Sequence, residues 1–216
     1  YGYDADGNRI SMEDVAGYTE YEYDGVGKIT AVNLTSGKKI LYTYDEFGNL
    51  AKLTYPDGTC VTYTYNVLDQ LTEIKDRQGK ITSYERDSNG NVTKVTRPNG
   101  TYTTIKYNEI GAISEIVNMG RKIFCTTPML SKFEYTYDQS GMIKSEVATN
   151  GNIVETNLYA YDNRGQLISS STIVKAGCTV LSSKDISYTY DNNGNRIQEV
   201  VSVCGRESTS TKYTYN

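Results

Sequence analysis

The chain has 216 residues, with 22 basic and 26 acidic side chains, a net charge of −4 and no histidine. This mild, evenly spread charge excludes the concentrated basic face that nucleic-acid binding normally requires. Without an imidazole, Ser-His-Asp and Cys-His catalysis and most zinc sites are excluded as well. No apolar run approaches the length of a membrane-spanning helix. We therefore expect no catalytic site, no cofactor and no bound metal.

The apolar content depends unusually on tyrosine, which supplies 21 residues against three phenylalanines and no tryptophan. Each tyrosine has a large apolar body and a hydroxyl that needs a partner or water. This composition predicts a thin, partly hydrated packed layer in place of a thick apolar core.

A phrase of the form Tyr-x-Tyr-Asp-x-x-Gly-Asn recurs along the chain. Its anchors follow one another at 20 or 21 residues in the first half and at 24 to 30 residues later. A period near 20 predicts an array of similar supersecondary units, here one array over residues 1–216. The anchor positions are Tyr3, Tyr23, Tyr44, Tyr65, Arg86, Tyr107, Tyr137, Tyr161, Tyr190 and Tyr215.

A short alternating segment ends at each anchor, as in Tyr42-Thr43-Tyr44. Alternation puts both rings on one face of a strand, whereas a helix would separate them by about 200°. The predicted tyrosine pairs are Tyr1/Tyr3, Tyr21/Tyr23, Tyr42/Tyr44, Tyr63/Tyr65, Tyr135/Tyr137, Tyr159/Tyr161, Tyr188/Tyr190 and Tyr213/Tyr215.

A turn follows each pair. Asp at the first position and Gly at the fourth are typical of a type I turn, and Gly supplies the left-handed backbone that closes the hairpin. Asn66 and Asn108 replace the Asp in two copies, and Asp69 replaces one Gly and should weaken its hairpin without abolishing it. The predicted turn residues are Asp4, Gly7, Asp24, Gly27, Asp45, Gly48, Asp87, Gly90, Asp138, Gly141, Asp162, Gly165, Asp191 and Gly194.

A second strand follows each of these turns, for example residues 50–55. Its apolar residues are spaced by three, as Leu50 and Leu53 are. A bulge, or a strand covered on both faces, would explain this spacing. A reverse turn such as Pro56-Asp57-Gly58 ends the unit.

The result is an all-β antiparallel meander of about 18 strands, which should curl into a spiral or partial barrel. Residues 118–132 and 173–184 break the period, and we expect them to be longer arms of the second connection, to which we assign no helix.

The four cysteines are too few for a disulfide scaffold. Equivalent places in neighbouring repeats should lie about 10 Å apart, farther than a disulfide spans. Free, half-buried thiols are therefore predicted at Cys60, Cys125, Cys178 and Cys204. The alternative is a Cys178–Cys204 disulfide, because the longer segments there could bend towards each other.

The stretch from Tyr44-Asp45-Glu46-Phe47-Gly48-Asn49 to Tyr63-Thr64-Tyr65 resembles the YD repeat of the Rhs family, and the likeness covers essentially the whole chain. This resemblance implies a β-sheet that spirals round a hollow interior. In polymorphic toxins such a shell encloses a C-terminal toxic domain, and in teneurins it supports adhesion. The Asp-Pro-x-Gly segment at which Rhs shells cleave themselves is missing here.

We therefore expect a non-enzymatic segment of a secreted or cell-surface shell, associated with a bacterial cell wall and part of a longer protein. Its partner would be the enclosed C-terminal domain of its own chain or a copy of itself. The alternative is an adhesin whose tyrosine rows bind glycans through Tyr42, Tyr44, Tyr63, Tyr65, Tyr135, Tyr137, Tyr159, Tyr161, Tyr188 and Tyr190. Asp4-Ala5-Asp6-Gly7-Asn8 resembles the start of an EF-hand calcium loop, but Val15 stands where that loop needs glutamate.

Overall fold

The computed structural model describes residues 1–15, 17–204 and 206–215. The described residues form strands and turns without helix, and they fall into two compact units, Tyr1–Pro98 and Asn99–Asn216. Asn216, which ends the last predicted repeat, lies outside the described residues. The all-β, antiparallel hairpin-repeat prediction is confirmed.

Unit 1 contains ten strands, each paired antiparallel with its neighbour in the chain. They are β1 (Gly2–Tyr3), β2 (Arg9–Asp14), β3 (Gly17–Tyr23), β4 (Ile29–Leu34), β5 (Lys39–Tyr44), β6 (Leu50–Thr54), β7 (Cys60–Tyr65), β8 (Leu71–Lys75), β9 (Ile81–Arg86) and β10 (Val92–Thr96).

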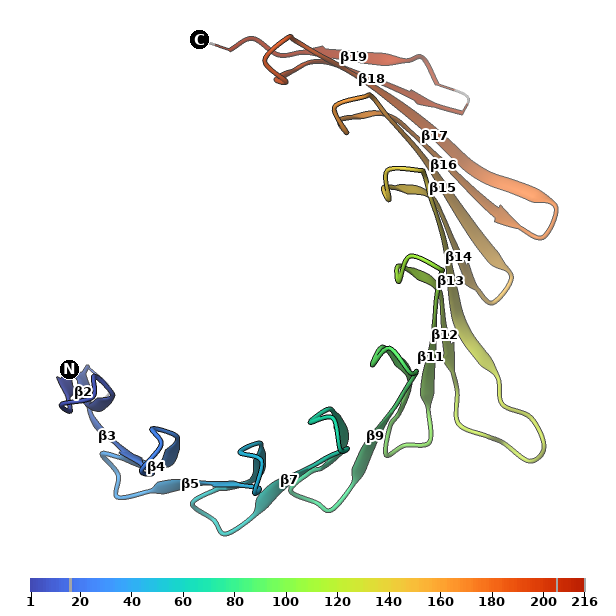
Figure 1. Cartoon of the computed structure of the whole chain (residues 1–216). Coiled ribbons are helices and arrows are strands. Elements are labelled where there is room, and N and C mark those ends of the chain that lie inside the picture. Colours follow the sequence, from blue (N-terminus) through green and yellow to red (C-terminus); the bar gives the residue numbers. More distant parts are fainter. Residues whose placement is uncertain (16, 205, 216) are drawn as a thin grey trace. The chain divides into compact units, whose positions relative to one another are not determined.

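Unit 2 contains nine strands, again paired antiparallel in chain order. They are β11 (Tyr102–Tyr107), β12 (Ile113–Met119), β13 (Met129–Tyr137), β14 (Ile143–Asn150), β15 (Ile153–Tyr161), β16 (Leu167–Ala176), β17 (Thr179–Tyr190), β18 (Arg196–Val203) and β19 (Thr209–Lys212). Within each unit the turns after the tyrosine pairs gather along one edge of the sheet, and the other turns along the opposite edge (Figure 1).

The described residues thus form 19 strands, in agreement with the predicted number of about 18. The last strand lies at a different place from the predicted one. β19 ends at Lys212, so the predicted strand pair Tyr213/Tyr215 lies beyond it, although the Tyr213 amide still donates to the Ile197 carbonyl at 2.9 Å. The predicted strand over residues 50–55 is one residue too long, because Tyr55 already begins the next turn.

A bulge explains the spacing of three in the second strands. Thr43 faces Lys52, but Tyr44 faces Leu50, so Ala51 is an extra residue in β6. An extra residue shifts the alternation by one and returns Leu50 and Leu53 to the same face. The same register shift occurs in all nine hairpins that follow a tyrosine anchor or Arg86.

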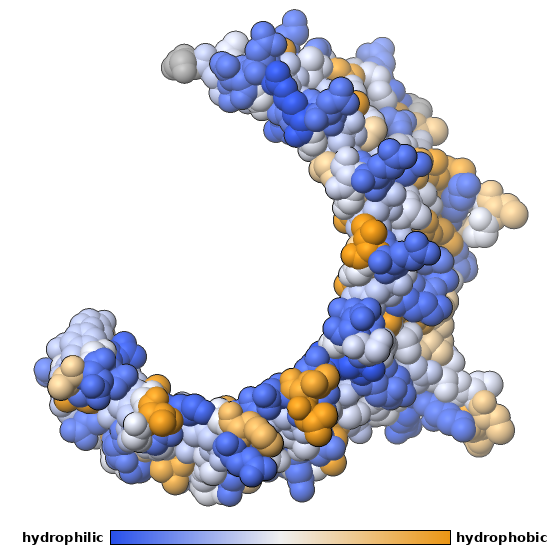
Figure 2. Space-filling model, viewed as in Figure 1, coloured by the Kyte–Doolittle hydropathy of each residue, from blue (hydrophilic) through white to orange (hydrophobic). Residues whose placement is uncertain are grey.

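The packed layer is thin, as the composition predicts. Among the described residues only Ala31 (1% exposed), Thr103 (7% exposed) and Gly120 are buried. Figure 2 accordingly shows separate apolar clusters on the visible face, divided by polar side chains. Stability must therefore depend on contacts along the sheet, between one hairpin and the next.

The two long arms differ from each other. Residues 120–128 form a loop that contains one isolated bridge, between Ile123 and Thr126. Residues 173–184 are almost entirely strand, because β16 and β17 extend until only Gly177 and Cys178 connect them. Neither arm contains a helix.

Candidate functional site

The first feature of interest is the turn after each tyrosine pair. Oδ1 of Asp45 accepts hydrogen bonds from the backbone amides of Phe47 (3.0 Å) and Asn49 (2.8 Å). The Gly48 amide donates to the Asp45 carbonyl at 3.0 Å, and Gly48 has φ +87°. The Asp45 carboxylate therefore accepts hydrogen bonds from two backbone amides that the turn itself leaves without a partner.

The same pair of amide bonds occurs at every predicted turn aspartate, and the fourth residue has φ between +77° and +88° at each predicted glycine. The Oδ1 acceptors are Asp4, Asp24, Asp45, Asp87, Asp138, Asp162 and Asp191. The side-chain oxygens of Asn66 and Asn108 accept in the same way. Asp69 adopts φ +57°, so the turn without glycine still forms.

Asparagine at the fifth turn position adds a further bond. The amides of Asn8, Asn91 and Asn195 donate to the second carboxylate oxygen of Asp4 (3.0 Å), Asp87 (3.1 Å) and Asp191 (3.0 Å). These side-chain bonds, followed by the backbone amides, lower the pKa of each of the three carboxyls below its usual value. These hydrogen bonds therefore stabilise the ionised form of the turn aspartates.

In most repeats the second tyrosine of a pair connects its hairpin to the one before it. The Tyr44 hydroxyl donates to the carbonyl of Ile29 at 2.8 Å, and Ile29 faces Tyr23 next to the bulge of the preceding hairpin. We call these bonds the tyrosine ladder; its other members are Tyr23 to Arg9 (2.7 Å), Tyr65 to Leu50 (3.0 Å), Tyr137 to Ile113 (2.7 Å), Tyr190 to Leu167 (2.7 Å) and Tyr215 to Arg196 (2.8 Å). Burial raises the pKa of Tyr44 and of Tyr65.

Arg86 takes the place of the ladder tyrosine in its repeat. Its Nη2 donates to the Leu71 carbonyl at 3.2 Å, and its Nη1 donates to Gly90 at 2.9 Å. Its Nε is the one buried side-chain nitrogen or oxygen atom, among the described residues, that has no hydrogen-bond partner. The arginine therefore keeps the ladder contact but leaves one N–H group unsatisfied.

The first tyrosines of the pairs lie on the same face as the ladder. Their cross-strand neighbours differ between the units, because Tyr42 faces Leu53 in unit 1, whereas Tyr135 faces Glu146 in unit 2. Burial, and then the Glu146 carboxylate, raise the pKa of both Tyr135 and Tyr159. All ten tyrosines of the predicted glycan rows are half-buried; their residues are Tyr42, Tyr44, Tyr63, Tyr65, Tyr135, Tyr137, Tyr159, Tyr161, Tyr188 and Tyr190.

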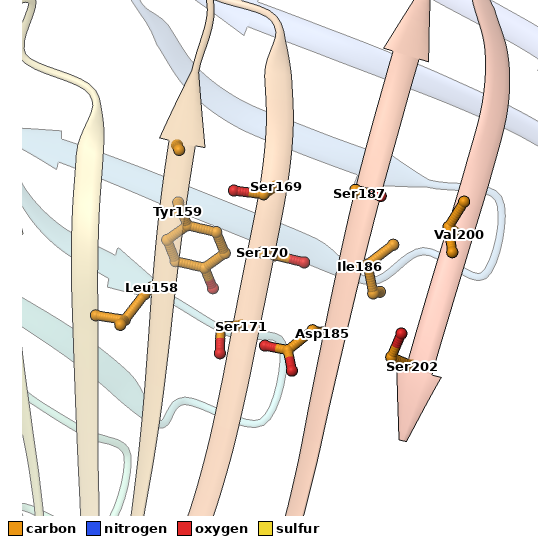
Figure 3. Close-up of a pocket in the computed structure, with 11 residues that line it drawn as sticks. Leu158, Tyr159, Ser169, Ser170, Ser171, Asp185, Ile186, Ser187, Val200 and Ser202 are labelled. Atoms are coloured by element: carbon orange, nitrogen blue, oxygen red, sulfur yellow. The ribbon is translucent and has the colours of Figure 1, made fainter. Parts of the chain in front are cut away.

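A shallow concavity of about 390 Å³ lies on strands β15 to β18 of unit 2 (Figure 3). Its lining combines serines with apolar side chains, and Asp185 is its one carboxylate; the serines are Ser169, Ser170, Ser171, Ser187 and Ser202. A serine nucleophile needs a neighbouring base such as an imidazole, and the chain has no histidine. The arrangement offers polar contacts but no evident nucleophilic chemistry.

The described residues contain no group of three or more His, Cys, Asp or Glu side chains arranged to hold a metal ion. They also contain no helix long and apolar enough to cross a membrane. All four cysteines are free thiols, so the Cys178–Cys204 disulfide is not formed. The prediction of half-buried thiols is correct only for Cys60. It is wrong for Cys125, Cys178 and Cys204, which are exposed because they lie in the long arms or near the end of the sheet.

Sequence reasoning missed the tyrosine ladder, although the chain contains a signal for it. The anchor position is Tyr in nine repeats and Arg in one, and it is never Phe. A position that needed only an aromatic ring would accept Phe, so this choice indicates a hydrogen-bond donor.

Comparison with known families identifies these repeats. The family model described as teneurin YD-shell matches residues 59–203, and the RHS repeat model matches residues 3–39 and 23–59. The chain belongs to the teneurin YD-shell family. A comparison with curated protein sequences gave no significant match.

Solved structures share the fold of this YD-shell chain. The crystal structure of TcdB2-TccC3 superposes with a TM-score of 0.73 at 19% identity, covering 95% of this chain and 12% of that one. The Tc holotoxin pore of Photorhabdus luminescens gives 0.71 at 19% identity, with the same coverage. The YD-shell chain therefore matches only about an eighth of the length of these proteins.

Proposed function

We propose that this YD-shell chain is a non-enzymatic wall segment of a secreted or cell-surface shell, which encloses a C-terminal toxin or effector domain of its own longer chain. The observation that carries the proposal is the tyrosine ladder. In most repeats it engages a tyrosine hydroxyl and a backbone carbonyl in a bond between neighbouring hairpins, as in the bond from Tyr44 to Ile29. A wall needs such lateral bonds, whereas a catalytic site needs polar groups that are free to meet a substrate.

The fold likeness supports this proposal. The similar structures are complexes of TcdB2 with TccC3, and one of them was solved without its hypervariable C-terminal region. Removal of that region left a structure that still superposes on this chain, with a TM-score of 0.70. A wall that keeps its fold without the C-terminal region is what a container requires.

Limited proteolysis of the full-length protein tests the proposal. The region after the YD array should resist a protease in the wild type and be cut in a Tyr44→Ala/Tyr65→Ala variant, because loss of two ladder bonds opens the wall. Phe47→Ser is the control, since Phe47 is 73% exposed in a turn and takes no part in the ladder. Equal cutting of wild type and ladder variant would contradict enclosure.

Carbohydrate binding is the second candidate. The observation that favours it is the pair Tyr135 and Tyr159 beside the Glu146 carboxylate, because aromatic faces and a carboxylate suit the apolar and hydroxyl sides of a sugar ring. Against it, the ladder hydroxyls of Tyr44, Tyr65, Tyr137 and Tyr190 are already engaged. A glycan array with wild type and Glu146→Ala tests it. Binding that is lost in the variant supports it, and no binding to any glycan contradicts it.

A further inference from the structure

The loop at residues 120–128 of unit 2 exposes more apolar surface than its neighbours. Phe124 is 95% exposed and Ile123 52% exposed, and the strand that leaves the loop begins with Met129 (44%) and Leu130 (50%). Large apolar side chains that gather at one tip, away from the packed face, mark an interaction site more often than isolated ones do.

The loop has a defined local structure. The amide of Gly120 donates to the Pro128 carbonyl at 2.7 Å and closes its base. At its tip Ile123 and Thr126 exchange two backbone hydrogen bonds, of 2.8 and 3.1 Å. Phe124 stands between them with φ +53°, a conformation that is uncommon for a residue other than glycine. The backbone therefore holds the Phe124 ring outward at a conformational cost.

The charged side chains at this tip are all positive. Arg121 and Lys122 are both exposed, and neither forms an ion pair with the described residues. The nearest carboxylates along the chain are already taken, because Glu115 pairs with Lys106 and Lys132, and Glu134 also pairs with Lys132. In a protein of net charge −4, the tip thus combines uncompensated positive charge with exposed apolar side chains.

We propose that this loop contacts an anionic lipid surface, with Ile123 and Phe124 inserted among the headgroups and Arg121 and Lys122 bound to their phosphates. Apolar side chains that enter the interface next to basic residues are how peripheral proteins hold to membranes. Each basic residue adds attraction to an anionic bilayer and none to a neutral one. This combination favours a lipid surface over a purely apolar protein groove, which would leave the two charges without partners.

Tryptophan fluorescence tests the proposal directly, because the chain has no tryptophan of its own. We expect the emission of Phe124→Trp to shift to the blue with vesicles of phosphatidylcholine and phosphatidylglycerol in equal parts. Vesicles of phosphatidylcholine alone should give a much smaller shift, and high salt should weaken the response to the anionic vesicles. Leu68→Trp is the matched control. Leu68 is also exposed (68%) at a turn, but its neighbour Asp69 is acidic, so an anionic surface should not attract it and its emission should not shift.

Vesicle sedimentation gives the second readout. Phe124→Ser, and separately Arg121→Ser/Lys122→Ser, should each weaken binding by about tenfold, whereas Leu68→Ser should not. An unchanged Phe124→Trp emission with anionic vesicles, or an equal shift in Leu68→Trp, overturns the proposal. So does a blue shift that grows with protein concentration in the absence of lipid, because it would show that the tip meets a second copy.

Discussion

The hydroxyl of Tyr44 donates a 2.8 Å hydrogen bond to the backbone carbonyl of Ile29, fifteen residues earlier in the chain. Ile29 faces Tyr23 at the bulge of the preceding hairpin, so one bond joins two successive anchors. Because the sheet has almost no buried core, such bonds have a larger share in its stability than they would in a globular domain.

We predict that Tyr44→Phe lowers the free energy of unfolding by about 1 kcal/mol, the usual contribution of one hydrogen bond. Gly48→Val should cost more, because φ +87° places a β-branched side chain against its own backbone. Thermal and urea unfolding of the two variants measure this order. Gly141→Ala is the control for the β-branch. Its φ is +80° and an added Cβ there meets no atom within 4 Å, so it should lower the free energy of unfolding less than Gly48→Val does. If Gly48→Val unfolded at the wild-type temperature, the assigned role of the turn glycine would be wrong.

Arg86→Tyr should stabilise the fold. It removes the buried Nε–H that lacks a partner and restores the hydroxyl donor found in neighbouring repeats. Relief of an unsatisfied buried donor is worth about 1 kcal/mol, and the midpoint of urea unfolding should rise accordingly. Arg86→Phe serves as the control, because it removes the same N–H but supplies no hydroxyl. A gain that is equal in both variants would show that the ladder bond itself contributes nothing at this position.

Stability should fall in acid through the turn carboxylates. The pKa of Asp4, Asp87 and Asp191 is lowered in the folded state by the amides of Asn8, Asn91 and Asn195. The unfolded chain, with an Asp pKa of about 3.9, therefore binds protons first as the pH falls. The stabilisation is complete above about pH 5 and is lost as the pH falls through the lowered folded values.

Circular dichroism melts between pH 7 and pH 2 follow this loss. The triple variant Asp4→Asn/Asp87→Asn/Asp191→Asn should have a flatter profile below pH 4, because asparagine does not titrate. Its turns should still form, since Asn66 and Asn108 accept the same two amide bonds in the natural chain. A triple variant that loses stability as steeply as the wild type would contradict this explanation.

The thiols should divide into two classes. Cys125, Cys178 and Cys204 are exposed and should react quickly with a thiol reagent in the native state, whereas half-buried Cys60 should react more slowly. Denaturation should abolish the difference. Mass spectrometry without reductant should find four free thiols, and detection of a Cys178–Cys204 disulfide would contradict the structure.

Much of the local structure could be predicted from the sequence, for reasons that particular residues illustrate. Tyr42-Thr43-Tyr44 alternates, and Asp45 to Gly48 carries the chemistry of one turn type, so this hairpin needs no distant partner to be recognised. The spacing of Leu50 and Leu53 left two explanations open, and only the register at Ala51 decided for a bulge. The strand at the end of the chain was placed on the wrong residues, because the Tyr213/Tyr215 pair follows the pattern but lies beyond β19.

The amino-acid sequence by itself determined the hairpins, because the alternation of side chains and the φ preferences of aspartate and glycine act within a few residues. The tertiary structure decided which polar groups meet across hairpins. The bond from Tyr44 to Ile29, the unpaired Nε of Arg86 and the outward ring of Phe124 all depend on how neighbouring strands lie and on which atoms water can reach. No pattern within one repeat contains that information, because it is a property of two adjacent hairpins together.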